Sequence, residues 1–159
     1  MTPYGKTAQT AIAAVSRLAE VYDAVDPVRL NSAQIAERRN LPQPVVAKLL
    51  TTLSLAGIVH GSPGPGGGYR LARPPAEVSL YDVVSLFERL EDNVSCPFGP
   101  DYCGTGPHCP MHFDMLKIRD QLLTFLKTTT FDRFVGWTSP PVASKTSKSL
   151  DVLPKAKPS

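Results

Sequence analysis

Apolar residues in the first third of the chain recur at intervals of three and four, which is the period of a helix with one buried face. This spacing predicts a first helix over residues 7–23 and a short second helix over 32–38. A third helix is expected to open at 41–44, because a proline in the first turn gives up only an N–H that has no partner there. Gly57 is expected to end it in a left-handed conformation.

Two short apolar segments follow at 58–60 and 69–72, and the glycine-rich segment 61–68 separates them. This arrangement predicts a β-hairpin. Two short helices followed at once by a hairpin are typical of a winged helix-turn-helix, in which the hairpin is the wing. The predicted fold class is therefore mainly α with a small β-hairpin wing.

Two more helices are expected after the hairpin. Ser79 and Asp82 form a capping-box pattern, and the apolar positions after them predict a helix that continues to Leu90. The second of these helices, over 111–126, has apolar residues at steps of three and four along one seam. The seam consists of Met115, Ile118, Leu122 and Phe125.

The apolar seam of the last helix needs a surface to cover it, because a small winged helix already has its own core. The simplest cover is the same helix of a second copy. This predicts a homodimer and makes 111–126 a long C-terminal dimerisation helix. Packing of the seam against the first helix is the alternative, and the two arrangements are compatible.

Charge divides the chain into three regions. Residues 1–75 carry eight basic and four acidic side chains, whereas residues 76–137 carry five basic and nine acidic ones. The basic first region is expected to be the DNA-binding winged helix. The acidic second region, with the cysteines and the dimerisation helix, is expected to face away from DNA. The region 138–159 is rich in Pro, Ser and Lys and is expected to be a disordered tail.

Two classes of protein are not expected from this sequence. No apolar run approaches the ~20 residues that a membrane-spanning helix requires, and the N-terminus lacks the pattern of a signal peptide. We therefore expect a cytoplasmic protein without a membrane partner. No nucleophile and base form a catalytic pattern, and the glycine-rich segment lacks the Lys-Ser/Thr ending of a phosphate-binding loop, so we expect no enzyme.

Three cysteines and a nearby histidine are the candidate chemistry of the chain. Cys96, Cys103 and Cys109 lie among prolines and glycines, and their odd number in a reducing compartment favours a metal site over disulfides. Thiolates are the ligands that iron-sulfur clusters require, whereas structural zinc sites usually have closer Cys-x-x-Cys pairs. We predict an iron-sulfur cluster, 2Fe-2S or 4Fe-4S, with zinc or unmetallated thiols as alternatives. His112 is the candidate fourth ligand and His108 its competitor.

Four short motifs accompany the cysteines. They are Ala-Gly-Ile-Val at 56–59, Gly-Pro-Gly-Gly-Gly-Tyr-Arg-Leu-Ala-Arg-Pro at 64–74, Val-Ser-Leu-Tyr-Asp-Val-Val at 78–84 and Thr-Thr-Thr-Phe-Asp at 128–132. Together and in this order they resemble the Rrf2 family of transcription regulators, over about residues 5–135. The family includes regulators of iron-sulfur assembly, nitric oxide sensors and iron regulators.

The resemblance implies a homodimer with crossed long helices, in which each subunit presents a recognition helix and a wing to one half-site of a palindromic operator in double-stranded DNA. By position it implies Cys96, Cys103 and Cys109 as cluster ligands, and His112 matches the histidine of the iron-sulfur assembly regulators. The recognition helix of this chain begins differently, since residues 42–45 stand where the family usually has serine and tyrosine.

The residues expected to contact DNA lie in the recognition helix, just before it, and in and beside the wing. Gln43 can reach a base edge, and Lys48 can contact DNA beside it. Arginines of the same region can clamp phosphates. These arginines are Arg38, Arg39, Arg70 and Arg73.

We predict a DNA-binding transcription regulator, acting as a repressor, that senses redox, nitric oxide or iron status through an iron-sulfur cluster. Two alternatives are open. One is a cofactor-free winged-helix regulator whose dimer is controlled by a protein partner. The other is an iron-sulfur carrier that has lost DNA recognition.

Overall fold

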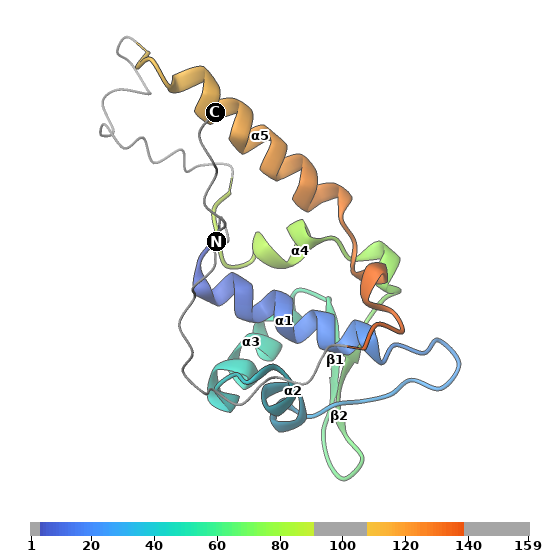
Figure 1. Ribbon diagram of the computed structural model, residues 1–159. Helices are drawn as coiled ribbons and strands as arrows, with labels where there is room; N and C mark the ends of the chain where they lie inside the picture. The colour runs from blue at the N-terminus through green and yellow to red at the C-terminus, as the bar shows by residue number, and fades with distance from the viewer. Residues whose placement is uncertain (1–3, 91–107, 139–159) are drawn as a thin grey trace, which may run out of the picture.

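The computed structural model describes residues 4–90 and 108–138 and shows a mostly helical chain with one small sheet (Figure 1). Its main elements, in chain order, are α1 (Lys6–Glu20), α2 (Ser32–Arg39), α3 (Gln43–Leu55), β1 (Val59–Ser62), β2 (Gly68–Leu71), α4 (Leu80–Val84) and α5 (His112–Thr128). Two short 3-10 helices, η1 (Pro75–Glu77) and η2 (Phe131–Phe134), precede α4 and follow α5. This order confirms the predicted mainly α fold with a small wing. None of the described helices is long and apolar enough to cross a membrane.

The helix-turn-helix is formed by α2 and α3. The Asn31 side chain accepts a hydrogen bond from the Gln34 N–H at 2.8 Å, and the Gln34 side chain accepts one from the Asn31 N–H at 2.9 Å. This reciprocal cap satisfies two N–H groups at the start of α2. Asn40 ends α2 in the left-handed region with φ 51°, and Gly57 follows α3 in the same region with φ 70°, as predicted.

The wing is the antiparallel pair of β1 and β2, in which Ser62 lies opposite Gly68. A third segment pairs with the other edge of β2. The Leu30 N–H donates to the Tyr69 carbonyl at 3.0 Å, and the Tyr69 N–H donates to the Leu30 carbonyl at 2.8 Å. The chain that enters α2 therefore passes beside the wing (Figure 1).

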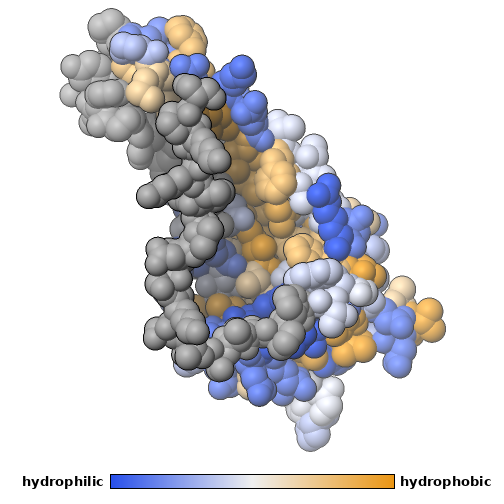
Figure 2. All heavy atoms as spheres, in the orientation of Figure 1, coloured by the Kyte–Doolittle hydropathy of each residue, from blue (hydrophilic) through white to orange (hydrophobic). Residues whose placement is uncertain are grey.

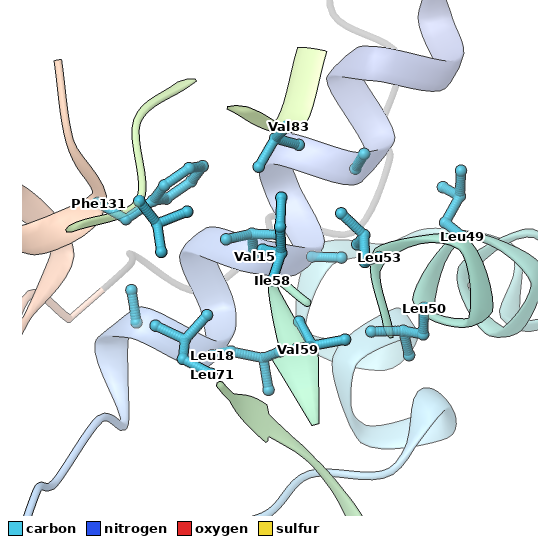
Figure 3. Packing of buried hydrophobic residues seen from close by; sticks show 14 of the residues in the cluster. Val15, Leu18, Leu49, Leu50, Leu53, Ile58, Val59, Leu71, Val83 and Phe131 are labelled. Atoms are coloured by element: carbon cyan, nitrogen blue, oxygen red, sulfur yellow. The ribbon is translucent and has the colours of Figure 1, made fainter. Parts of the chain in front are cut away.

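The core lies around α1, which is buried along most of its length. Figure 3 shows side chains from α1, α3, the wing, α4 and η2 meeting there. Its labelled members are Val15, Leu18, Leu49, Leu50, Leu53, Ile58, Val59, Leu71, Val83 and Phe131. Because both strands contribute to the same core as the helices, the base of the wing and the helix-turn-helix form one packed body.

The helix after Ser79 is shorter than predicted. Its capping box is present: the Asp82 N–H donates to the Ser79 hydroxyl at 3.1 Å, and the Ser79 N–H donates to the Asp82 carboxylate at 2.9 Å. However, α4 ends at Val84 and not at Leu90. The Phe87 N–H bonds to the carbonyl of Val84, three residues back, so the chain tightens into turns. These turns still bring Phe87 and Leu90 against the core.

The last helix, α5, extends away from the packed body (Figure 1). Its C-terminal end is attached to that body. Leu126 is fully buried, and the carbonyl of Thr129 accepts a hydrogen bond from the Leu80 N–H at 2.9 Å. The end of α5 is therefore joined directly to the start of α4.

Candidate functional site

The two faces of α3 have opposite characters. The inner face is buried in the core and consists of Val46, Leu49, Leu50 and Leu53. The outer face exposes Gln43 and Lys48, the two residues of this helix predicted to contact DNA. A helix with one packed face and one exposed face that carries polar side chains suits a recognition helix that enters a groove of DNA. The contacts of these two residues with DNA stay a prediction.

A groove separates the outer face of α3 from the wing. It is lined by Thr51, Ser54 and Leu55 of α3, Gly61 and Ser62 of β1, Pro63 of the turn and Tyr69 of β2. Leu55 is 87% exposed. On the wing, Ser62 also accepts a hydrogen bond from Nη1 of Arg29 at 2.7 Å. A guanidinium is thus placed beside the groove by a residue from outside both α3 and the hairpin.

Arg39 is engaged inside the protein. Its guanidinium donates to the Glu20 carboxylate at 2.6 Å, to the Ser16 hydroxyl at 2.8 Å and to the Ala13 carbonyl at 3.1 Å. The ring of Trp137 lies 6.0 Å from it. These bonds use the Nε and Nη2 groups of the guanidinium and hold it against α1. In the single chain Arg39 therefore joins α2 to α1, and its contact with DNA stays a prediction.

The other three predicted arginines lie at three separate places. Arg38 is half-buried on α2, and Arg70 is half-buried on β2, beside a small pocket that the loop after α1 helps to line. Arg73 lies 3.7 Å from the Asp82 carboxylate, and both side chains are more than a third exposed. An ion pair this exposed to solvent contributes only about 0–1 kcal/mol to stability. A DNA phosphate can therefore replace the Asp82 carboxylate as the partner of Arg73. All three stay candidates for DNA contact.

Two of the four predicted cluster ligands lie within the described residues. Cys109 is half-buried, and its carbonyl accepts a hydrogen bond at 3.0 Å from the N–H of His112, the first residue of α5. The two ligand side chains thus belong to one turn of the chain. The His112 ring stacks on His108, with centroids 4.0 Å apart and 18° between the planes. Cys96 and Cys103 lie outside the described residues.

The donor set at the start of α5 fits an iron-sulfur cluster that has one ligand other than a thiolate. A cysteine thiolate and a histidine imidazole can both be ligands of iron in such clusters. Within residues 4–90 and 108–138, no group of three His, Cys, Asp or Glu side chains is arranged to hold a metal. The other two predicted ligands, Cys96 and Cys103, belong to residues 91–107, outside the described part of the chain.

The members of the predicted dimerisation seam differ in how far the single chain buries them. Leu122 packs against the core and Met115 is half-buried, whereas Ile118 and Phe125 are 58% and 49% exposed. Phe113, which the predicted seam omits, is 69% exposed and lines an open groove together with Phe125. Figure 2 shows hydrophobic residues gathered along this helix. Part of the seam therefore packs inward, and part of it is left uncovered in the single chain.

The sequence of this chain is similar to sequences of a known protein family. Residues 5–136 match the family Rrf2, described as iron-dependent transcriptional regulator. The chain belongs to the Rrf2 family. The HTH-type transcriptional regulator IscR of Pectobacterium carotovorum is 30% identical over 136 residues, which cover 86% of this chain and 79% of that protein. IscR of Aliivibrio salmonicida is 32% identical over 126 residues, covering 79% and 71%.

Solved structures of similar proteins have the same fold as this Rrf2 chain. T. potens IscR superposes with a TM-score of 0.65 at 21% identity, covering 83% of this chain and 85% of that chain. CymR, the global cysteine regulator of B. subtilis, superposes with a TM-score of 0.66 at 21% identity, covering 87% and 100%. Family and fold together make this Rrf2 protein a winged-helix DNA-binding transcription regulator and not an enzyme.

Two residues of interest in this Rrf2 protein were not identified from the sequence. Arg29 lies in the loop before α2, and its partner Ser62 is 33 positions away, so no local pattern connects them. Phe113 lies outside the predicted seam. The available signal was a large aromatic residue near the start of a helix that already had an apolar seam, because adjoining exposed apolar residues mark an interaction surface.

Proposed function

We propose that this Rrf2 protein is a homodimeric repressor that binds a palindromic operator and senses redox, nitric oxide or iron status through an iron-sulfur cluster. The proposed ligands are Cys96, Cys103, Cys109 and His112. The observation that carries the proposal is the position of Cys109 and His112 at the start of α5. They join the predicted ligand loop directly to the helix that has an uncovered apolar face.

The residues of α5 also connect the ligand end to the DNA-binding body. At the far end of the helix, Leu126 is buried, the Lys127 ammonium lies 4.7 Å from the ring centroid of Tyr81, and Thr129 is bonded to Leu80. A shift of α5 at its first turn would therefore reach the start of α4.

The affinity of a dimer for DNA depends on the spacing of its two recognition helices. Movement of one α5 against the other would change that spacing and with it the occupancy of the operator. When bound, an iron-sulfur cluster would supply a redox-active centre tuned by its ligands and their hydrogen bonds. The description of the family as iron-dependent supports a sensor of this kind.

In this proposal the chain has two working regions and acts in the cytoplasm. Residues 1–75 bind DNA, and the exposed outer face of α3 beside the wing supports this assignment. Residues 76–137 hold the cluster and form the dimer, and the exposed Ile118 and Phe125 support the second part. The tail, 138–159, is left without a role.

The first experiment is anaerobic purification followed by an absorbance spectrum and analysis of iron and acid-labile sulfide. Visible charge-transfer bands with matching iron and sulfide support the proposal, and their ratio to protein separates 2Fe-2S from 4Fe-4S. A protein that stays colourless after reconstitution contradicts the cluster and favours the cofactor-free regulator. A coloured protein without salt-dependent DNA affinity favours the carrier.

The two stacked histidines provide a matched pair for assigning the fourth ligand. Because the His108 and His112 rings are in contact, His108→Ala is the control for His112→Ala. A changed spectrum in His112→Ala alone supports the proposed ligand, and a changed spectrum in His108→Ala alone assigns the role to its neighbour. If Cys103→Ala binds operator like the wild type in both oxidised and reduced states, the cluster has no part in the switch.

A further inference from the structure

Arg29 is held against the wing from two sides. Its Nη1 donates to Oγ of Ser62 on β1 at 2.7 Å. Its neighbour Leu30 exchanges two backbone hydrogen bonds with Tyr69 on β2, at 3.0 and 2.8 Å. The backbone of this segment is therefore fixed to one strand and the end of its arginine side chain to the other.

Gly68 lets the chain next to Arg29 approach the wing closely. It lies opposite Ser62 in the hairpin, on the strand between the two residues. A Cβ on Gly68 would lie 3.0 Å from the backbone of Leu30, and its φ of 141° favours glycine. Because this position has no side chain, the backbone beside Arg29 can lie close against β2, and from there the Arg29 side chain reaches Ser62 on β1.

Arg29 differs from the other bonded arginines in that its partner in the described part of the chain is not a carboxylate. In the described part of the chain, Arg17 and Arg39 pair with the Glu20 carboxylate, and Arg73 lies near Asp82. Arg29 is bonded to a neutral hydroxyl and forms no salt bridge with another described residue. A guanidinium has five N–H donors, and this bond uses one of them.

We propose that Arg29 contacts a phosphate of the DNA backbone and that Ser62 holds its guanidinium in place for that contact. The inference rests on the DNA-binding function of the family. Because Ser62 also lines the groove between α3 and the wing, Arg29 stands at the wing side of this groove, while Lys48 stands on α3. A duplex that receives α3 in its groove brings backbone phosphates towards the wing. The planar fork of an arginine suits a phosphate.

The test compares three variants in binding to a fluorescein-labelled, random-sequence duplex of about 30 base pairs, because phosphate contacts do not depend on sequence. Fluorescence anisotropy is measured at a series of KCl concentrations. We expect Arg29→Ala to weaken binding about tenfold and to lower the slope of log K against log salt by about 1 per bound protomer. Ser62→Ala keeps the positive charge of Arg29 but removes the hydroxyl that holds it. We expect this variant to lose part of the DNA affinity while the slope of log K against log salt stays unchanged. Arg29→Lys should behave likewise.

Arg119→Gln is the matched control for the loss of one positive charge. Arg119 lies on α5, away from the wing in Figure 1, and pairs with Asp120 at 2.9 Å. This variant should keep both affinity and slope. Thermal unfolding of every variant shows whether the fold is intact, and Arg29→Gln replaces Arg29→Ala if the alanine variant unfolds.

Three outcomes separate the possibilities. The proposal is overturned if Arg29→Ala binds DNA like the wild type. It is also overturned if Arg29→Ala loses only as much affinity as Ser62→Ala and keeps the salt slope of the wild type, because Arg29 then does not contact a phosphate. If the wild type binds no duplex at any salt concentration, the DNA-binding function itself has failed. A lower slope in Arg29→Ala with an unchanged slope in Arg119→Gln supports the proposal.

Discussion

The helices α3 and α5 differ in what holds them in place. The shorter helix, α3, has 13 residues and buries four apolar side chains in the core of its own chain. The longer helix, α5, has 17 residues and buries one, Leu126. The position of the recognition helix is thus set within a single chain. The described contacts of α5 with the core, Leu122 and Leu126, lie in its second half, so its first half is held less firmly by the chain itself.

This difference has an energetic basis. Full burial of a side chain such as Phe113, Ile118 or Phe125 contributes about 1.5–3 kcal/mol. In the single chain these side chains are 69%, 58% and 49% exposed, so much of that stabilisation is still available to a partner. A recognition helix needs a constant angle to read DNA. A helix that responds to a signal needs more than one favourable arrangement.

The largest effect is expected from a cavity in the body that holds α3. Leu50→Ala should lower the free energy of unfolding by about 2–5 kcal/mol, because Leu50 is fully buried and its loss leaves a void. Leu55→Ala on the same helix is the control and should cost less than about 0.5 kcal/mol, since Leu55 lies at the surface. Urea unfolding measures both. Equal costs would contradict the inward and outward faces assigned to α3.

A somewhat smaller loss is expected from the ion pair that joins α2 to α1. Arg39→Ala should lower the free energy of unfolding by about 3 kcal/mol, because the Glu20 carboxylate, 2% exposed, would lose a close partner. Arg17→Ala is the control: Arg17 pairs with the same carboxylate from a more exposed position and should cost less. The single tryptophan, Trp137, lies beside Arg39 and reports the change by fluorescence. Unchanged stability with a lower salt slope in DNA binding would show that Arg39 acts as a DNA contact and not as a link between α1 and α2.

The uncovered face of α5 is tested by self-association and not by the stability of the single chain. Phe113→Ser and Phe125→Ser should each raise the dissociation constant of the dimer at least about tenfold, because each removes a large apolar surface from the interface. Lys117→Ser, which changes a polar residue of the same groove, should have little effect. Sedimentation equilibrium gives the constants. If both phenylalanine variants associate like the wild type, this face of α5 lies outside the dimer interface.

The smallest effect is expected at the cap of α2. Asn31→Ala should cost about 1 kcal/mol, because the Gln34 N–H loses its acceptor at the start of the helix. Asn31→Asp keeps an acceptor oxygen and should restore most of the stability. Chemical denaturation of the three proteins measures the difference. A cost for the aspartate variant as large as for alanine would show that the cap acts through something other than its side-chain oxygen.

Most elements of the fold were predicted from short-range patterns. The positions of α1, α2, α3, the wing and α5 follow from the spacing of apolar residues and from turn residues such as Gly57. The start of α4 was also predicted correctly, since Ser79 and Asp82 are three residues apart. Its end was not, because the apolar residues Phe87 and Leu90 pack against the core from turns and not from a continued helix, so the apolar spacing does not mark the last helical residue.

The candidate site was less predictable, because its decisive contacts join residues far apart in the chain. Arg38 and Arg39 are neighbours on the same helix and look alike in the sequence, yet the carboxylate that engages Arg39 lies 19 positions earlier. Arg29 meets the wing 33 positions later. Caps, turns and helical periods act within about four residues, so the order of residues was enough to specify them. Which charges are neutralised and which apolar side chains stay exposed depends on how the completed elements pack, and this was visible only in the folded chain.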